Sequence, residues 1–520
     1  MQAARAPKAV RALIHRRTFA VRFIPTLTSS LRKLCAFFER PWGLNLTLAT
    51  LFVGTMVAAF WEVLPGSVLF LAPDAPLEPL TFREACAQLA SPAPALLNLF
   101  RLIPFPWGYE CSFWFDMMLL GATAFLLLRS YHLPLGSAWV GAFAAAFTGY
   151  FATLFCAGHR GIVDAIAVTA FAFWLLQRAL QSQQWRWFVA LGLVLPLGLA
   201  AQADIWFIFV LALAAYALVQ IILQCRATET RSVLRRLTPR FALALLLFGL
   251  TGIPALRHTF GAAQATRSAQ LQQATAAHTS RTAERHAQWR FTTDWSLPPE
   301  DCIDFLWPNA KGCTSYAFDP SPYRGRMGSA TQVLRQHSIH IGALTLLLAL
   351  LAVAWRNPDL RHTHRSFWAS LAVISLLLAF GRYTPFYQWV WHLPFIDQIR
   401  APVKWLHLTG FAVALLAGMG SATLLKRSHP ATAVLLCAWL AITSVCVIRP
   451  FVFPIRLPDE ARFAQLPPHA RVFATANFHA FLRAHGYVPT DNPYRAHAAL
   501  MLRPAGHGFE LKLILPEVRR

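Results

Sequence analysis

Long apolar runs alternate with short polar segments along most of this 520-residue chain. Most runs approach the roughly 20 residues that a helix needs to cross about 30 Å of hydrocarbon. We count eleven runs, at 45–64, 112–128, 136–157, 162–177, 187–201, 204–223, 241–256, 339–355, 366–381, 404–424 and 431–448. The runs at 187–201 and 204–223 nearly touch, so they are either two spans or a merged or re-entrant pair. The pattern predicts an all-α polytopic membrane protein with about eleven transmembrane helices.

Positive charge in the short loops sets the predicted orientation. With the N-terminus inside, the short inner loops carry thirteen Lys and Arg residues and the shorter outer loops carry six. Loops rich in Lys and Arg stay on the cytoplasmic side, and the basic segment at the N-terminus favours the same choice. We therefore expect the N-terminus inside and, after eleven crossings, the C-terminus outside.

This topology divides the chain into five parts. We expect a basic cytoplasmic arm at 1–41, a transmembrane module of about seven helices at 42–256, and a second of about four helices at 339–449. Residues 257–338 are predicted to form a long outer-face loop, and residues 450–520 an outer-face tail. The tail contains "ARVFAT", a helical "NFHAFLRAHGY" and a period-two "FELKLIL", a mixture that predicts a small α/β unit.

The composition supports a membrane protein and argues against a nucleic-acid partner. Hydrophobic residues make up 56% of the chain and charged residues 13%, whereas a soluble domain carries about 25% charged residues. The net charge is +24. In a membrane protein such charge gathers beside the bilayer, where it fixes orientation and meets anionic lipid. We expect membrane lipid as a partner and no nucleic acid.

The acidic residues are distributed asymmetrically between the two predicted sides. Of 23 acids, only Glu39, Glu229 and Asp359 fall on the inner side. Acids contribute little to topology, so the bias needs another cause. Either the outer face carries a site that handles cations, protons or hydroxyl nucleophiles, or the longer outer segments simply offer more room.

Several acids lie at the predicted outer ends of spans, where an ionisable group usually faces a polar cavity or a partner. A carboxylate there can act as general base on a hydroxyl, or hold a divalent cation against a phosphate. The alternative for each acid is helix capping or an interfacial position. These residues are Glu62, Asp74, Glu78, Asp116, Asp164 and Asp204.

Basic residues near the same ends have two interpretations. Arg160, which follows His159, either pairs with Asp164 or clamps a lipid phosphate. Arg400 and Lys404, just before the tenth run, either bind phosphate together or snorkel at the interface.

Other motifs narrow the chemistry. The sequence has no P-loop before a helix, no GxSxG and no HExxH, so an enzyme of this kind would draw on an activated, membrane-bound donor. There is no Cys/His metal spacing, and we propose no metal site. Four cysteines fall in predicted outer loops, where the local pairs Cys86–Cys111 and Cys302–Cys313 are candidate disulfides.

Four stretches carry a resemblance to a known family. They are "LPGSVLFLAPDAPLEPL", "AGHRGIVDAIAVTAFAFWLL", "SLPPEDCIDFLWPN" with "DPSPYRGRMG" and "HIGALTLLLALLA", and "LLLAFGRYTPFYQWVWHLPFIDQIRAPVKWLHLTGFAVALLAGMG". With the layout of spans, they cover most of residues 45–425. On these residues the chain resembles the YfhO-type bacterial membrane proteins, which are related to the GT-C class of polytopic glycosyltransferases.

The resemblance implies a cavity that faces away from the cytoplasm and takes sugar from a polyprenyl-phosphate carrier. Carried over by position, the catalytic acids are Asp74 and Asp164, and the phosphate contacts are Arg160 and Arg400. The first outer loop lacks the paired acids found in several GT-C families, so Glu62 or Glu78 can take the place of Asp74. The cofactor is unknown, with a divalent cation as one option.

Three functions follow as expectations. The first is a GT-C-like glycosyltransferase in the inner (cytoplasmic) membrane, which moves a sugar from a polyprenyl-phosphate carrier to an envelope glycan or lipid acceptor on the outer face. The second is a transporter or flippase for a lipid-linked glycan, which favours charges buried within the membrane. The third is a non-catalytic envelope assembly factor that binds through its outer loop and tail.

Overall fold

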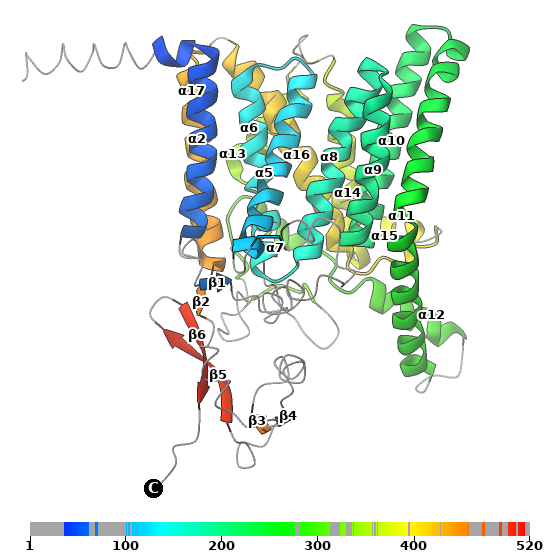
Figure 1. Ribbon diagram of the computed structural model, residues 1–520, viewed down its shortest axis with the longest axis vertical. Coiled ribbons are helices and arrows are strands. Elements are labelled where there is room, and N and C mark those ends of the chain that lie inside the picture. The colour runs from blue at the N-terminus through cyan, green and yellow to red at the C-terminus, as the bar shows by residue number, and fades with distance from the viewer. Residues whose placement is uncertain are drawn as a thin grey trace, which may run out of the picture.

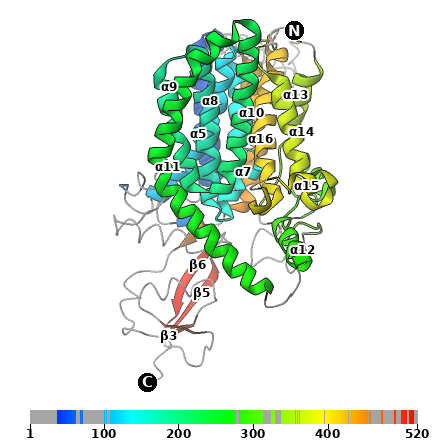
Figure 2. The ribbon, with the colours of Figure 1, turned by 90° about the vertical axis from the view of Figure 1, so that its right-hand side faces the viewer.

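The computed structural model shows a bundle of apolar helices with a sheet and a short helix beyond one end (Figures 1 and 2). It describes residues 36–520 apart from the following gaps: 62–67, 71–99, 101, 104–106, 276–280, 313–322, 329–334, 336, 356, 358–359, 361, 394–395, 427, 453, 457–470, 474–487, 491–497, 506–507 and 515–520.

Every predicted apolar run forms a helix or a pair of helices. These elements are α2 (Pro41–Phe60), α5 (Trp107–Ser130), α6 (Leu135–Ala146), α7 (Gly149–Cys156), α8 (Arg160–Ser182), α9 (Trp185–Ala201), α10 (Ala203–Ala227), α11 (Thr230–Thr275), α13 (Ala343–Ala354), α14 (Arg365–Ala379), α16 (Leu406–Leu425) and α17 (Ala431–Ile448). Within the described part of the chain, seven segments are long and apolar enough to cross a membrane, and α9, α13 and α14 are shorter apolar helices. The protein is therefore a helical, multi-span membrane protein.

Two predicted boundaries need correction. The run at 136–157 is split into α6 and α7, and the peptide N–H of Gly149 at the break donates to the His340 carbonyl at 2.9 Å. A Cβ at Gly149 would lie 3.1 Å from His340, closer than most Cβ contacts, so a larger residue here would push the two segments apart. The run at 241–256 is the middle of α11, which continues on both sides and passes beyond the end of the bundle (Figure 2). The runs at 187–201 and 204–223 are separate helices that meet at Gln202.

The core lies along α16, which packs against α6, α13 and α14. Small residues allow the backbones to approach closely. A Cβ at Gly420 would lie 1.8 Å from the Leu348 carbonyl oxygen of α13, and one at Gly418 would lie 3.0 Å from the Ser137 carbonyl oxygen of α6. Glycine contacts of this kind are typical of membrane helix interfaces, because lipid offers no hydrophobic drive for association.

Polar and irregular segments gather at one end of the bundle. The helix α12 (Arg281–Thr292) and the strands lie there (Figures 1 and 2), and the 3-10 helix η2 (Pro299–Phe305) belongs to the same polar segment of the chain. The short helix α15 (Pro385–Val390) and the 3-10 helices η5 (Ile396–Gln398) and η6 (Pro402–Trp405) lie near the same end. The first residues of α8 and α5 also belong to this end, which we call the loop end.

The six strands form one sheet with the order β1-β2-β6-β5-β3-β4. Their bounds are β1 (Val68–Phe70), β2 (Pro454–Arg456), β3 (Arg471–Phe473), β4 (Val488–Thr490), β5 (Ala498–Ala505) and β6 (Gly508–Ile514). β5 and β6 form an antiparallel hairpin, and β1 pairs antiparallel with β2. The sheet therefore joins the segment after the first span to the tail.

The tail agrees with the sequence where it is described. The period-two stretch "FELKLIL" supplies β6, and "ARVFAT" supplies β3. The helix expected in "NFHAFLRAHGY" lies outside the described residues.

Candidate functional site

The structure describes three of the four predicted site residues. Asp164, Arg160 and Arg400 are described, whereas Asp74 and its alternatives Glu62 and Glu78 lie outside the described residues. Asp74 follows the last residue of β1 by four positions in the sequence.

Arg160 and Asp164 lie one turn apart at the start of α8. A turn through Gly158, whose φ of +94° favours glycine, directs the chain into the helix. Arg160 is the first helical residue, and its Nε lies 3.8 Å from Asp164 Oδ2. Both side chains are buried, with exposed fractions of 2% and 3%. Of the two interpretations offered by the sequence, this structure contains the ion pair.

The neighbouring helix α5 supplies a matching pair of polar residues. Ser112 accepts a hydrogen bond from the Arg160 guanidinium, and one turn further along, the Asp116 side chain faces Asp164 and interacts with it. The sequence placed Asp116 at the opening of a span. In the structure Asp116 lies in the third turn of α5, in the first part of the candidate span Cys111–Ser130, and is only 2% exposed.

These four residues form what we call the α5–α8 cluster: Ser112, Asp116, Arg160 and Asp164. Both helices run in the same direction, and the two residues on each are four positions apart. Ser112 therefore lies beside Arg160, and Asp116 lies beside Asp164 one turn further along. With a rise of about 1.5 Å per residue, Asp164 lies about 6 Å along α8 from Arg160. The cluster therefore begins at the loop end and reaches into the span.

A small cavity lies next to the cluster, further into the bundle. Its volume is about 20 Å³, and its lining includes Leu120 one turn beyond Asp116 and Ile166 two residues beyond Asp164. Its polar lining residues include Thr148, Tyr150 and His407, and the rings of Tyr150 and His407 stack at 4.2 Å. A space of this size holds about one water molecule, so in this conformation it is closed to a larger substrate.

Arg400 lies elsewhere at the loop end. Its side chain is exposed, and its guanidinium carbon lies 4.5 Å from the ring centre of Phe291 on α12. Lys404, the second predicted phosphate contact beside it, pairs with Asp204 at the start of α10. The predicted phosphate contacts Arg160 and Arg400 thus lie against different elements, α5 and α12.

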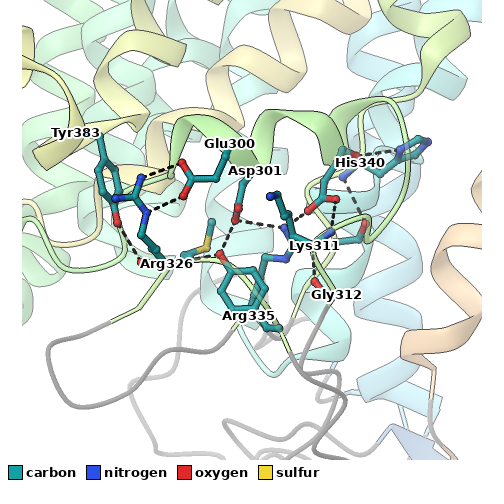
Figure 3. Close-up of polar contacts among 12 residues, drawn as sticks. Glu300, Asp301, Lys311, Gly312, Arg326, Arg335, His340 and Tyr383 are labelled. Atoms are coloured by element: carbon teal, nitrogen blue, oxygen red, sulfur yellow. Dashed lines mark hydrogen bonds and ion pairs between the residues drawn. The ribbon is translucent and has the colours of Figure 1, made fainter.

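A second polar cluster links η2 to the segment before α13 (Figure 3). Arg335 is fully buried, donates to Asp304, and lies 3.6 Å from Asp301. Its guanidinium also donates to the Gly312 carbonyl at 2.7 Å. Tyr323 donates a hydrogen bond to Asp301. We call Asp301, Asp304, Tyr323 and Arg335 the Arg335 cluster.

An exposed ion pair flanks this cluster. Arg326 makes two hydrogen bonds to Glu300, of 2.6 and 2.9 Å, and its guanidinium lies over the Tyr383 ring (Figure 3). Hydrogen bonding to Arg326 lowers the pKa of Glu300, whereas burial raises the pKa of Asp301 despite Tyr323 and Arg335. These contacts of Glu300 and Asp301 hold the loop in place. Asp319, another acid of the loop, lies outside the described residues.

The predicted Cys302–Cys313 disulfide is not formed in this structure, because Cys302 carries a free thiol. Its expected partner Cys313 lies outside the described residues, as does Cys86 of the other pair. Burial, together with the nearby acids, raises the pKa of the Cys302 thiol to about 11.

Sequence reasoning missed Arg335 and the pairing of Asp116 with Asp164. Arg335 lies 31 residues from Asp304 in a polar stretch without periodicity, so no local signal marked it. The i, i+4 spacing of polar residues on both α5 and α8 was a signal in the sequence. It indicates that the two pairs face each other only once the two helices are known to be neighbours.

The site offers two kinds of chemistry. Its carboxyl groups can accept or hold protons, and its guanidinium can bind an anion once it leaves Asp164. Within the described part of the chain, no group of three or more His, Cys, Asp or Glu side chains is arranged to hold a metal ion. In comparisons with known proteins, no family model and no curated protein matches this chain.

Proposed function

We propose that this protein is a GT-C-like membrane glycosyltransferase, which moves a sugar from a polyprenyl-phosphate carrier to an envelope glycan or lipid. The proposal includes eleven crossings, an inside N-terminus and an outward-facing loop end in the cytoplasmic membrane. The observation that carries it is the burial of Arg160 and Asp164 side by side at the loop end, with Asp116 and Ser112 of α5 against them.

The location of this cluster fits the family resemblance of the sequence. The loop end also holds β1, which is paired with the tail strand β2 and precedes Asp74 by four residues. In GT-C enzymes, an acid of the first outer loop and an acid after the third span act together. Asp74 and Asp164 are the corresponding residues here.

In the proposed reaction, Asp74 accepts the proton of the acceptor hydroxyl. The hydroxyl oxygen forms a bond to the anomeric carbon of the sugar, while the bond from that carbon to the carrier phosphate oxygen breaks. The lipid phosphate leaves with the bonding electrons. Arg160 and Arg400 stabilise its negative charge, and Asp164 positions Arg160 or supports a divalent cation.

This scheme requires movement from the present conformation. Arg160 is engaged with Ser112 and Asp164, and the adjacent cavity holds no more than about one water. Binding of the carrier phosphate would draw the guanidinium away from Asp164 and open the space between α5, α8 and the loop.

One observation favours a transporter or flippase of lipid-linked glycan as the second candidate. Charged residues are buried within the spans, and the span formed by α6 and α7 is broken beside the cavity. Broken helices around buried polar groups are typical of transporter sites. The broken span here lacks a charged residue of its own between Leu135 and Cys156, so the transferase is the better-supported proposal.

The test is mass spectrometry of envelope glycans and lipid-linked sugars from cells that lack the gene. The cells are complemented with wild type, Asp74→Asn, Asp164→Asn, or Asp397→Asn as a matched acid outside the site. A transferase predicts the loss of one sugar from a glycan and accumulation of its carrier-linked donor, restored by wild type and Asp397→Asn only.

Other outcomes identify other functions. A transporter predicts that a complete lipid-linked glycan accumulates on the cytoplasmic side without loss of a sugar. Full restoration by both Asp74→Asn and Asp164→Asn would refute the catalytic assignment.

A further inference from the structure

The α5–α8 cluster has an imbalance of charge that needs a ligand. Two carboxyl groups, Asp116 and Asp164, face one guanidinium, Arg160, and all three residues are at most 3% exposed. If both acids were ionised, the cluster would carry a net negative charge at the edge of the hydrocarbon. Burying an uncompensated charge costs several kcal/mol, so this state is strongly disfavoured.

The contact between the carboxyl groups shows what restores the balance. The side chain of Asp116 faces that of Asp164, and the two carboxyl groups are close enough to interact. A carboxylate is only an acceptor, and a carboxyl group donates a hydrogen bond only when it is protonated. Two acids in this contact therefore need one proton between them, as in the paired acids of aspartic proteases.

An independent observation concerns Asp164 Oδ2. This buried oxygen accepts no hydrogen bond from a donor among the described residues, and the Arg160 Nε is 3.8 Å away, too far for a hydrogen bond. A buried carboxylate oxygen without a donor is costly. The Asp116 carboxyl is the adjoining group that can provide the donor, once it carries a proton.

We propose that Asp116 and Asp164 form an intramembrane proton-binding site that holds one proton between them at neutral pH. With that proton, the cluster of two acids and one guanidinium is neutral, and α5 and α8 are held together by a hydrogen bond. Without the proton, the two carboxylates repel each other. This assignment is independent of glycosyl transfer.

Other ionisable groups among the described residues lie around the cluster. Among the described residues, the charged groups that act on Asp116 include Asp164 and Arg160. A group of interacting histidines lies next to Arg160 in the structure: His159, His337 near Arg335, and His407 on α16. The Lys404–Asp204 pair lies between η6 and α10. Lys404 is neutralised by its own acid, so its charge does not offset the second carboxylate of the cluster.

The experiment is infrared difference spectroscopy of the full chain in lipid nanodiscs, which resolves the carbonyl stretch of a protonated carboxylic acid. At neutral pH the wild type should show this band, with the downshift typical of exchange into heavy water. Asp116→Asn and Asp164→Asn should each remove the band completely. The Asn amide can donate to the remaining carboxylate without a proton, so these variants should keep the fold.

Two matched controls distinguish the cluster from other acids. Asp204→Asn removes an ion-paired acid on α10 and should leave the band unchanged. Asp301→Asn removes the loop acid whose pKa burial raises, and it should also leave the band of the cluster in place. Circular dichroism of each variant checks that the helices are intact.

Three results would overturn the proposal. The first is a wild-type spectrum without a protonated carboxyl band at neutral pH. The second is a band that survives in both Asp116→Asn and Asp164→Asn. The third is a band that disappears in sodium chloride but not in choline chloride, which would mean that a metal ion occupies the position of the proton.

Discussion

Replacing Arg335 by methionine should release the loop that η2 begins. Arg335 is fully buried between Asp301 and Asp304, and it also donates to the Gly312 carbonyl. Methionine fills a similar length of space but leaves both acids buried without their cation. Removing one partner of a buried ion pair costs about 3–5 kcal/mol. Since about 1.4 kcal/mol corresponds to a factor of ten, local opening should become about 10²- to 4 × 10³-fold more frequent.

Hydrogen exchange measured by mass spectrometry on peptides that cover 299–312 is the direct assay. Arg326→Met is the matched control: it removes an arginine from Glu300 of the same 3-10 helix, but its side chain is 63% exposed. Exposed pairs contribute little, so exchange in this variant should stay close to wild type.

The pH dependence of the Arg335→Met variant gives a second check. Loss of the guanidinium should raise the pKa of Asp301 further above its ordinary value, so the folded loop gains stability as the pH falls and Asp301 takes up a proton. The excess exchange of Arg335→Met should therefore shrink between pH 7 and pH 5. Equal exchange in Arg335→Met and Arg326→Met at pH 7 would refute the argument that burial makes the difference.

Three further predictions use other parts of the molecule. Gly420→Ala should lower the melting temperature, because its Cβ would meet a backbone oxygen at 1.8 Å and overpacking costs about 1–3 kcal/mol. Gly410→Ala on the same helix should not lower it, because no heavy atom lies within 4 Å of the added Cβ. An equal decrease in melting temperature in both variants would contradict the packing argument. The thiol of Cys302, with a pKa of about 11, should react slowly with iodoacetamide at pH 8 and faster as the pH rises; intact mass after alkylation shows whether it is free. Burial lowers the pKa of His337 well below its ordinary value, so stability present above about pH 6.5 should be lost as the pH falls; exchange in 337–342, corrected for intrinsic rates, should rise from pH 7.5 to 5.5, and His337→Gln should remove most of that rise.

The spans could be predicted from the sequence because lipid imposes a one-dimensional rule: a helix must be long and apolar enough to cross. Each apolar run therefore marked a helix. The break in the third run could not be predicted, since "AAAFTGY" is as apolar as an unbroken span. Its cause is a tertiary contact, in which Gly149 donates to the carbonyl of His340.

The burial of Asp116 could not be predicted for a related reason. The predicted run 112–128 and the candidate span Cys111–Ser130 both place this acid near the same end of the span, but only the packing of α5 against α8 buries its side chain. Asp164 and Arg160 were recognised because they are neighbours in the sequence. Their partners on α5 depend on which helices pack together, and this information is absent from the periodicity of a single segment.

The pairing of β1 with β2 has a consequence for the time course of synthesis. Val68 pairs with Arg456, so 388 positions separate strands that lie side by side. At about 5–20 residues per second, β1 leaves the ribosome roughly 20–80 s before its partner exists. The segment after the first span therefore waits through the insertion of nearly every other helix before it reaches its final register. A chain that terminates before β2 would leave that segment without its partner strand, which couples the first loop to completion of the polypeptide.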